Sequence, residues 1–194
     1  MPHRFDDAAG WAKVFDDPER DAWQKPDDVL RAMALEPSMT VADVGAGTGY
    51  FAVRLARAVS SGKVIATDIE PDMVRYLTER ATREKLSNLR AVNATATASG
   101  LERASVDRIV VVHVWHHIAD RVAYARDLAA ALKPGGKLFI VDFSLDGQRG
   151  PPPKMRLAPE TILGDLTTAG FTARASAVTL PDQYIVEAEI PRRP

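Results

Sequence analysis

Apolar runs alternate with amphipathic stretches along most of this chain. The apolar runs predict buried strands at residues 40–44, 64–67, 89–92, 108–112 and 137–141. Stretches with helical spacing predict helices at residues 26–35, 51–59, 71–81, 121–132 and 159–169. Because strands alternate with helices, the pattern predicts an α/β fold with a parallel sheet covered on both faces.

Two further strand-like runs, 171–179 and 183–190, end the pattern with only Leu180-Pro181-Asp182 between them. A connection this short permits only an antiparallel return. We therefore expect a mostly parallel sheet with one reversed strand near the carboxyl end.

Two segments differ in composition from the rest of the chain. Residues 1–25 are charged and carry Trp11, Phe15 and Trp23. Residues 144–157 contain three consecutive prolines, Pro151 to Pro153, which predict an extended loop. We interpret 1–25 as an amino-terminal lid segment and 26–194 as the main domain.

Length, charge and cysteine content exclude several classes of function. The chain has 194 residues, a length that suits one domain. Its 26 acidic and 25 basic side chains nearly balance, so it has no excess positive charge that would attract nucleic acid. The absence of cysteine excludes disulfides, thiolate metal sites and a cysteine nucleophile. With no apolar leader and no run of membrane-spanning length, we expect a cytoplasmic protein with no membrane span and no nucleic-acid partner.

A glycine-rich turn follows the first predicted strand and precedes a helix. It runs from Gly45 to Gly49, and the acidic residue Asp68 ends the second strand roughly 20 residues on, the offset at which a carboxylate binds a ribose. The dinucleotide pattern G-x-G-x-x-G requires its third glycine at position 50, where this chain has Tyr50. The spacing here is G-x-G-x-G.

These motifs resemble those of the class I S-adenosylmethionine (SAM)-dependent methyltransferases. The first strand with Asp43 and the glycines resembles motif I, and the stretches around Lys133-Pro134-Gly135-Gly136 and Ala169-Gly170-Phe171 resemble later motifs of that family. Within it, the chain is most similar to the small-molecule group related to ubiquinone/menaquinone-biosynthesis methyltransferases. The resemblance implies a Rossmann-like three-layer sandwich with seven strands, the carboxyl-terminal one antiparallel, and SAM as cofactor.

The resemblance also implies which residues bind the cofactor. Asp68 matches the ribose-binding acid, Met73 an adenine-pocket residue, and Asn93-Ala94 an element that reads the adenine amine, with Asn where Asp is commoner. The full candidate set is Asp43, Gly45, Ala46, Gly47, Thr48, Gly49, Asp68, Ile69, Met73, Asn93 and Ala94.

Three histidines follow the fourth strand, at the edge of the sheet where we expect the methyl group. His113, His116 and His117 are candidate catalytic residues, because an imidazole there could take a proton from the acceptor. In the family a similar histidine pair is usually structural. Since the three begin at a strand end and share no single helical face, we expect no metal site.

Candidate substrate contacts come from the two unusual segments. Phe15 and Trp23 are expected to cover the substrate, with ordinary packing as the alternative. Arg149 and Arg156, with Lys154, could meet an anionic acceptor, with solvated loop charges as the alternative.

The sequence therefore predicts methyl transfer from SAM to an O, N or C nucleophile of a small molecule. The fourth strand lacks the Asn/Asp-Pro-Pro-aromatic element that the family uses on nucleobase and glutamine amino groups. A non-catalytic SAM-binding regulator stays open, as do a nicotinamide-dependent oxidoreductase and assembly as a homodimer.

Overall fold

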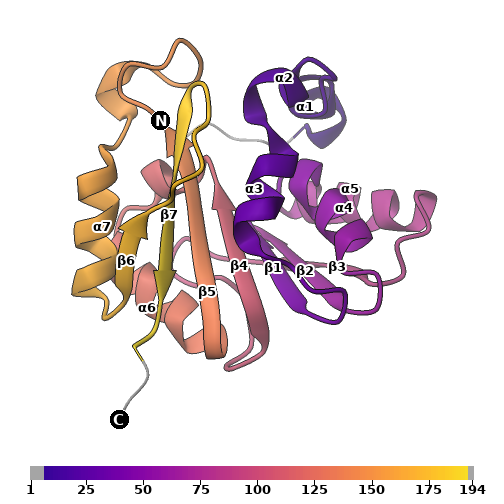
Figure 1. Cartoon of the computed structure of the whole chain (residues 1–194). Helices are drawn as coiled ribbons and strands as arrows, with labels where there is room; N and C mark the ends of the chain where they lie inside the picture. Colours follow the sequence, from indigo (N-terminus) through magenta and orange to yellow (C-terminus); the bar gives the residue numbers. More distant parts are fainter. Residues whose placement is uncertain (1–6, 192–194) are drawn as a thin grey trace.

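A seven-stranded sheet lies between two layers of helices (Figure 1). The computed structural model of the chain describes residues 7–191. The strands are β1 (Thr40–Val44), β2 (Lys63–Asp68), β3 (Leu89–Asn93), β4 (Val106–Val112), β5 (Leu132–Phe143), β6 (Thr172–Ala175) and β7 (Gln183–Glu189). Their spatial order is β3-β2-β1-β4-β5-β7-β6.

The direction of the strands confirms the prediction. β1 to β5 are parallel to one another, and β7 inserts antiparallel between β5 and β6. Two boundaries differ most. β6 covers four of the nine residues expected at 171–179. β5 begins at Leu132, which pairs with Val106 of β4 ahead of an irregularity in the register.

The main-domain helices follow the predicted order. They are α3 (Pro26–Met33), α4 (Tyr50–Ala58), α5 (Pro71–Arg83), α6 (Arg121–Ala131) and α7 (Pro159–Thr168). Short 3-10 turns add η1 (Trp115–His117) and η2 (Pro153–Met155), the second within the segment predicted as an extended loop. Proline opens α3, α5 and α7, where its missing N–H has no partner to lose.

The sheet has a hydrophobic core on each face. Val110 packs with α3, α4 and α5 on one side, whereas Ile109 and Val111 pack with α6 and α7 on the other. Successive residues of a strand point to opposite faces, so an almost wholly apolar run in β4 fills both cores.

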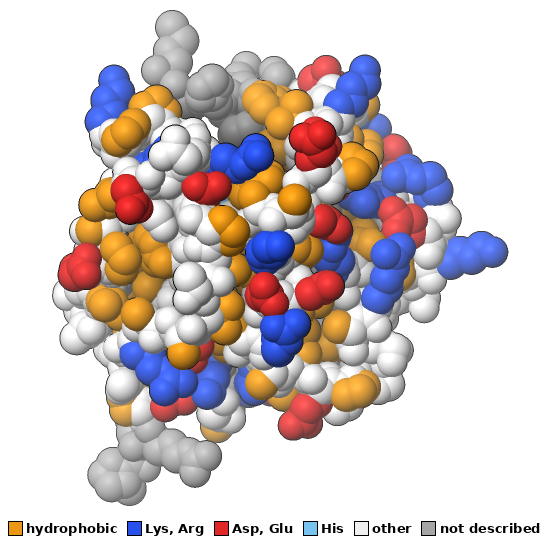
Figure 2. Space-filling model, turned by 45° about the horizontal axis from the view of Figure 1, so that its top comes forward, with side chains coloured by type: hydrophobic (Ala, Val, Ile, Leu, Met, Phe, Trp, Pro, Cys, Tyr) orange, Lys and Arg blue, Asp and Glu red, His pale blue; other side chains and the backbone are white. Residues whose placement is uncertain are grey.

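The amino-terminal segment forms two short helices, α1 (Ala8–Phe15) and α2 (Arg20–Gln24). Both lie at the top of Figure 1, with the 144–158 loop, at the edge where the parallel strands end. Figure 2 brings this edge forward and shows acidic and basic side chains intermingled, in keeping with the balanced charge.

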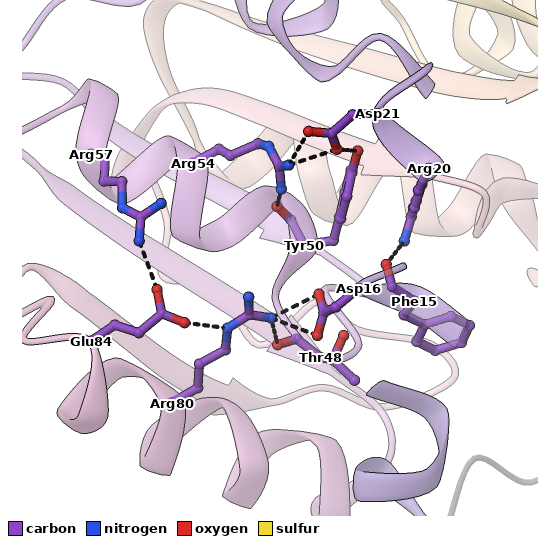
Figure 3. Close-up of polar contacts among 10 residues, drawn as sticks. All are labelled: Phe15, Asp16, Arg20, Asp21, Thr48, Tyr50, Arg54, Arg57, Arg80 and Glu84. Carbon is purple, nitrogen blue, oxygen red and sulfur yellow. Dashed lines mark hydrogen bonds and ion pairs between the residues drawn. The ribbon is translucent and has the colours of Figure 1, made fainter. Parts of the chain in front are cut away.

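Ion pairs attach α1 and α2 to the main domain. Arg80 of α5 donates to both carboxylate oxygens of Asp16 at 2.9 Å, and to the carbonyl of Thr48 at 2.9 Å (Figure 3). Arg54 of α4 donates to Asp21 at 2.7 and 2.9 Å. Helices α1 and α2 are therefore held beside the glycine turn.

Candidate functional site

The glycine turn connects β1 to α4, and its backbone explains its composition. Gly45, Gly47 and Gly49 have φ values of 74°, 55° and 96°, a region that L side chains rarely adopt. A Cβ on Gly45 would lie 2.3 Å from a methyl of Val114, and one on Gly49 would lie 2.3 Å from a methyl of Leu77. The turn thus packs tightly between the segment after β4 and helix α5.

Asp68 holds this turn from the end of β2. Its carboxylate accepts a hydrogen bond from the N–H of Gly47 at 2.8 Å and another from the N–H of Glu70 at 2.9 Å. Burial raises the pKa of Asp68, and the two backbone donors act against that shift. The predicted ribose-binding acid therefore lies beside the predicted turn.

The other candidates for the adenosine end come from neighbouring elements. Asn93 pairs with Asp68 across β3 and β2, and the N–H of Ala94 donates to the Asp68 carbonyl at 2.8 Å. Met73 is buried near the start of α5, whereas Ile69 is 54% exposed. The parallel pairing of β2 with β3 therefore brings Asp68 next to Asn93 and to Ala94, which follows it.

Several polar atoms around the turn are buried without a hydrogen-bond partner in the described structure. They are Oδ2 of Asp43, Oγ1 of Thr48 and Oγ1 of Thr67. Burial, together with the charge of Asp68, raises the pKa of Asp43 to about 7. An unpartnered buried polar group costs free energy, so these atoms indicate a site that a polar ligand completes.

His113 follows β4 in a strained conformation, with φ at 58°. Its ring stacks on Phe143 with centroids 3.9 Å apart, and on Trp23 at 6.0 Å. Burial, with the positive charge of Arg20, lowers its pKa to about 3. His113 is therefore neutral at physiological pH and a weak proton acceptor there.

His116 forms a pair with a carboxylate. Its Nδ1 lies 2.9 and 3.1 Å from the two oxygens of Asp142, and both side chains are almost fully buried. The N–H of Phe143 also donates to Asp142 at 2.8 Å. A carboxylate on Nδ1 fixes the tautomer that leaves Nε2 to accept a proton. His117 is exposed, and its ring centroid lies 4.2 Å from that of His116.

The four candidate substrate residues fall into different surroundings. The ring of Phe15 lies next to Gly47. A Cβ on Gly47 would be 3.5 Å from this ring, which is an ordinary van der Waals distance. Trp23 stacks with His113, and the guanidinium of Arg149 lies 5.5 Å from the Trp23 ring. Arg156 donates to five backbone carbonyls within residues 144–151, so it holds the loop together.

Sequence reasoning missed Arg20 and Asp142. Asp142 lies near the end of the fifth strand, so the argument that selected Asp68 also applies to it. Arg20 belongs to a short helix without a motif, and its place beside α4 depends on contacts that no local pattern shows.

Comparison with known proteins identifies the family. A family described as a methyltransferase domain matches residues 41–136. The structure resembles that of a SAM-dependent methyltransferase from Aquifex aeolicus with a TM-score of 0.86 and 28% identity, covering 94% of this chain and 97% of that one. The chain belongs to the class I SAM-dependent methyltransferases.

The sequence relatives of this chain include methyltransferases named for menaquinone and ubiquinone biosynthesis. It is 27% identical over 124 residues to a demethylmenaquinone methyltransferase of Oceanobacillus iheyensis, covering 63% of this chain and 51% of the relative. It is 32% identical over 117 residues to a ubiquinone/menaquinone biosynthesis C-methyltransferase of Shewanella oneidensis, covering 59% and 47%. The chain thus spans about half the length of these relatives.

A more distant fold relative has been solved with the cofactor. Phosphoethanolamine N-methyltransferase 2 of Haemonchus contortus, in complex with S-adenosyl-L-methionine, superposes with a TM-score of 0.72 at 17% identity, covering 88% of this chain and 53% of that one. At that identity the likeness concerns the fold alone.

The residues around the glycine turn fit SAM. The three glycines of the turn carry no side chains of their own, and Asp68 lies where a ribose diol would bind. The unpartnered Oδ2 of Asp43 can accept a hydrogen bond from an ammonium group, and the start of α4 favours a carboxylate. Among the helices within residues 7–191, none has the length and apolar character needed to cross a membrane.

Proposed function

We propose that this chain transfers the methyl group of SAM to an O, N or C nucleophile of a small molecule. The observation that carries the proposal is the glycine turn held by Asp68, with the buried, unpartnered oxygen of Asp43 beside it. Strong geometric constraints on three glycines, together with unpartnered polar atoms, support a ligand site rather than a simple connection.

The cofactor supplies an activated, electrophilic methyl group when it is bound. The chain's own task is then to hold the nucleophile in line and to exclude water, and positioning of this kind can lower a barrier by roughly 7–11 kcal/mol. We propose that Phe15 and Trp23 of the lid segment, residues 1–25, cover the site on the domain formed by 26–194. Residues 1–6 of that segment lie outside the described structure.

We propose that an aromatic wall contacts the acceptor. Trp23, His113 and Phe143 stack with centroid separations of 3.9 to 6.4 Å at the ends of β4 and β5. Two curated relatives are named for quinone-pathway substrates, which supports a planar, small-molecule acceptor. Because an aromatic wall favours flat rings, such an acceptor suits this surface.

We assign any proton transfer to His116 rather than to His113. The pKa of His113 is lowered to about 3, whereas His116 has a carboxylate on Nδ1 that orients its ring. His117 is exposed and stays a weaker candidate. Cytoplasmic location and homodimer formation stay predictions.

The test is incubation of the protein with methyl-labelled SAM and an extract of small metabolites. We expect label in a small product, and loss of that label in Asp68→Ala, because this change removes the group that holds Gly47. Asp27→Ala, at an exposed aspartate of α3, is the matched control and should retain activity. SAM binding with no labelled product from any extract would favour the non-catalytic regulator.

A further inference from the structure

Two buried nitrogen atoms at the edge where the parallel strands end have no hydrogen-bond partner among residues 7–191. They are Nε2 of His113, which follows β4, and Nε2 of Gln183, the first residue of β7. The side chain of Gln183 is almost fully buried, at 3% exposure. Because a buried polar atom without a partner costs free energy, the two atoms indicate a polar contact site apart from the glycine turn.

Strand register places the two side chains side by side. Gln183 pairs with Phe143 across β7 and β5, and residues paired in this way project from the same face of a sheet. The ring of His113 stacks on that same Phe143, with centroids 3.9 Å apart. Gln183 also partly offsets the lowering of the pKa of His113, which requires the two side chains to lie close together. Both nitrogen atoms therefore belong to one small region beside the aromatic wall.

A chain of hydrogen bonds from α2 determines which end of the Gln183 amide is free. Arg20 donates from Nε and Nη2 to the side-chain oxygen of Gln24 at 3.3 and 3.2 Å. The amide nitrogen of Gln24 then points the other way and donates to the side-chain oxygen of Gln183 at 2.5 Å. Reversal of either amide would place two donors against each other. The free end of Gln183 is therefore its N–H donor.

His113 presents the second atom in a neutral ring, because burial and the charge of Arg20 lower its pKa to about 3. A neutral imidazole has one nitrogen that accepts and one that donates. A hydroxyl group suits either tautomer, since its oxygen accepts from Gln183 and its hydrogen can donate to Nε2, or its oxygen can accept from both. A carbonyl oxygen suits only one tautomer, and an ammonium group has no acceptor for the Gln183 N–H.

We propose that Gln183 and His113 bind a hydroxyl group on the flat ring of the methyl acceptor, with Gln183 donating to the hydroxyl oxygen. This inference rests on the proposed function and narrows its acceptor to a hydroxylated aromatic compound. The aromatic wall packs against the ring, and the hydroxyl contact fixes how the ring is turned there.

Gln24 is then a positioning residue for Gln183. Helix α2 contacts the pair through Trp23, which stacks on His113, and through Gln24, which binds Gln183. The lid segment therefore has to move to admit the acceptor. When it closes again, the bond from Gln24 turns the Gln183 N–H toward the acceptor, so closure and acceptor orientation depend on one another.

The test follows the side-chain amides in nitrogen–proton correlation NMR spectra of the isotope-labelled protein. The chain has three glutamines and two asparagines, so these signals are few enough to assign individually. In wild type saturated with S-adenosylhomocysteine (SAH), we expect phenol to move the Gln183 N–H signal downfield, as a new hydrogen bond does. Toluene, with a methyl group in place of the hydroxyl, should give no downfield shift. The amide of Gln148, on the exposed part of the 144–158 loop, is the internal control.

Variants measure how much the contact contributes. Gln183→Met removes the amide at similar volume and should weaken phenol binding about 5- to 10-fold, as for loss of a neutral hydrogen bond, with unchanged SAH affinity. Gln24→Met should weaken phenol binding less and reduce the downfield shift of the Gln183 signal, because Gln183 is then free to turn. Gln148→Met, the same substitution at an exposed glutamine, should change neither affinity.

The outcomes separate this inference from the proposed function. A protein that binds SAH but shows no downfield shift of Gln183 with phenol would overturn the inference and leave the proposed function standing. Equal weakening of SAH and phenol by Gln183→Met would also overturn it, because Gln183 would then only support the fold. If Gln183→Met does not fold, the comparison of phenol with toluene in wild type decides alone. A wild-type protein that does not bind SAH would instead overturn the proposed function.

Discussion

Replacement of Asp43 by Asn should stabilise the protein at alkaline pH while weakening cofactor binding. Asp43 is 2% exposed, and its Oδ2 has no partner in the described structure. The N–H of Ala52 donates to this carboxyl group, and an Asn amide oxygen of the same shape can accept that hydrogen bond. The change therefore removes a buried charge with little change in volume.

The magnitude follows from the two pKa values of Asp43. The ordinary value is 3.8, and burial with the charge of Asp68 raises the pKa to about 7 in the folded chain. Between these values the folded chain holds a proton that the unfolded chain has released, so the free energy of unfolding falls as pH rises, and it levels off above pH 7. From pH 5 to pH 8.5 the loss is about 3 kcal/mol, at about 1.4 kcal/mol per pKa unit.

The assay is urea denaturation of wild type and Asp43→Asn at pH 5 and pH 8.5, followed by tryptophan fluorescence. Because the variant lacks the titrating group, its stability relative to wild type should rise by about 3 kcal/mol between the two pH values. Calorimetry should also show that SAH affinity rises with pH through 7 in wild type, because the ionised carboxyl group binds the ammonium, and stays level in the variant.

A difference in stability that is the same at pH 5 and pH 8.5 would refute this reasoning. It would mean that Asp43 ionises in the folded protein near its ordinary pKa, and that its buried oxygen has found a partner. Asp17→Asn, at an exposed aspartate before α2, is the control and should show no such pH dependence.

Three further predictions concern the lid and the proton acceptor. Phe15→Ala should weaken SAH binding and slow turnover, because its ring covers Gly47, and unchanged turnover and substrate affinity would remove the lid hypothesis. Arg80→Met should release α1 from α5 and make the segment before α3 more sensitive to limited proteolysis, and an unchanged cleavage pattern would show that the ion pair with Asp16 does not hold it. His116→Gln should lower kcat about 100-fold for an acceptor that must lose a proton, with little change in KM, whereas equal activity would exclude His116 as the base.

The sequence was sufficient for the parts of the fold that local patterns determine. The buried run 40–44, the glycine turn and the following helix each have their own signal, and the structure has them where they were expected. The antiparallel return of β7 also followed from local evidence, because no helix separates it from β6. The cofactor candidates Gly47 and Asp68 were selected from the same local patterns, and the structure places them side by side.

The remaining features depend on contacts between distant residues. The short helices α1 and α2 are held by Asp16 with Arg80 and Asp21 with Arg54, which no periodicity reveals. The pairing of His116 with Asp142 joins the ends of two strands, and only the sheet order makes it visible. The position of Arg20 near the site depends on the packing of α2 against α4, where its guanidinium lies over the ring of Tyr50.

Calorimetric titration of the wild-type protein with SAH tests the central claim most directly, with NADH as the comparison ligand. We predict saturable binding of one SAH per chain and no heat with NADH. A cooperatively folded protein that gives no heat with SAH, or that binds NADH instead, would contradict the assignment of the glycine turn and Asp68 to a methyl-donor site.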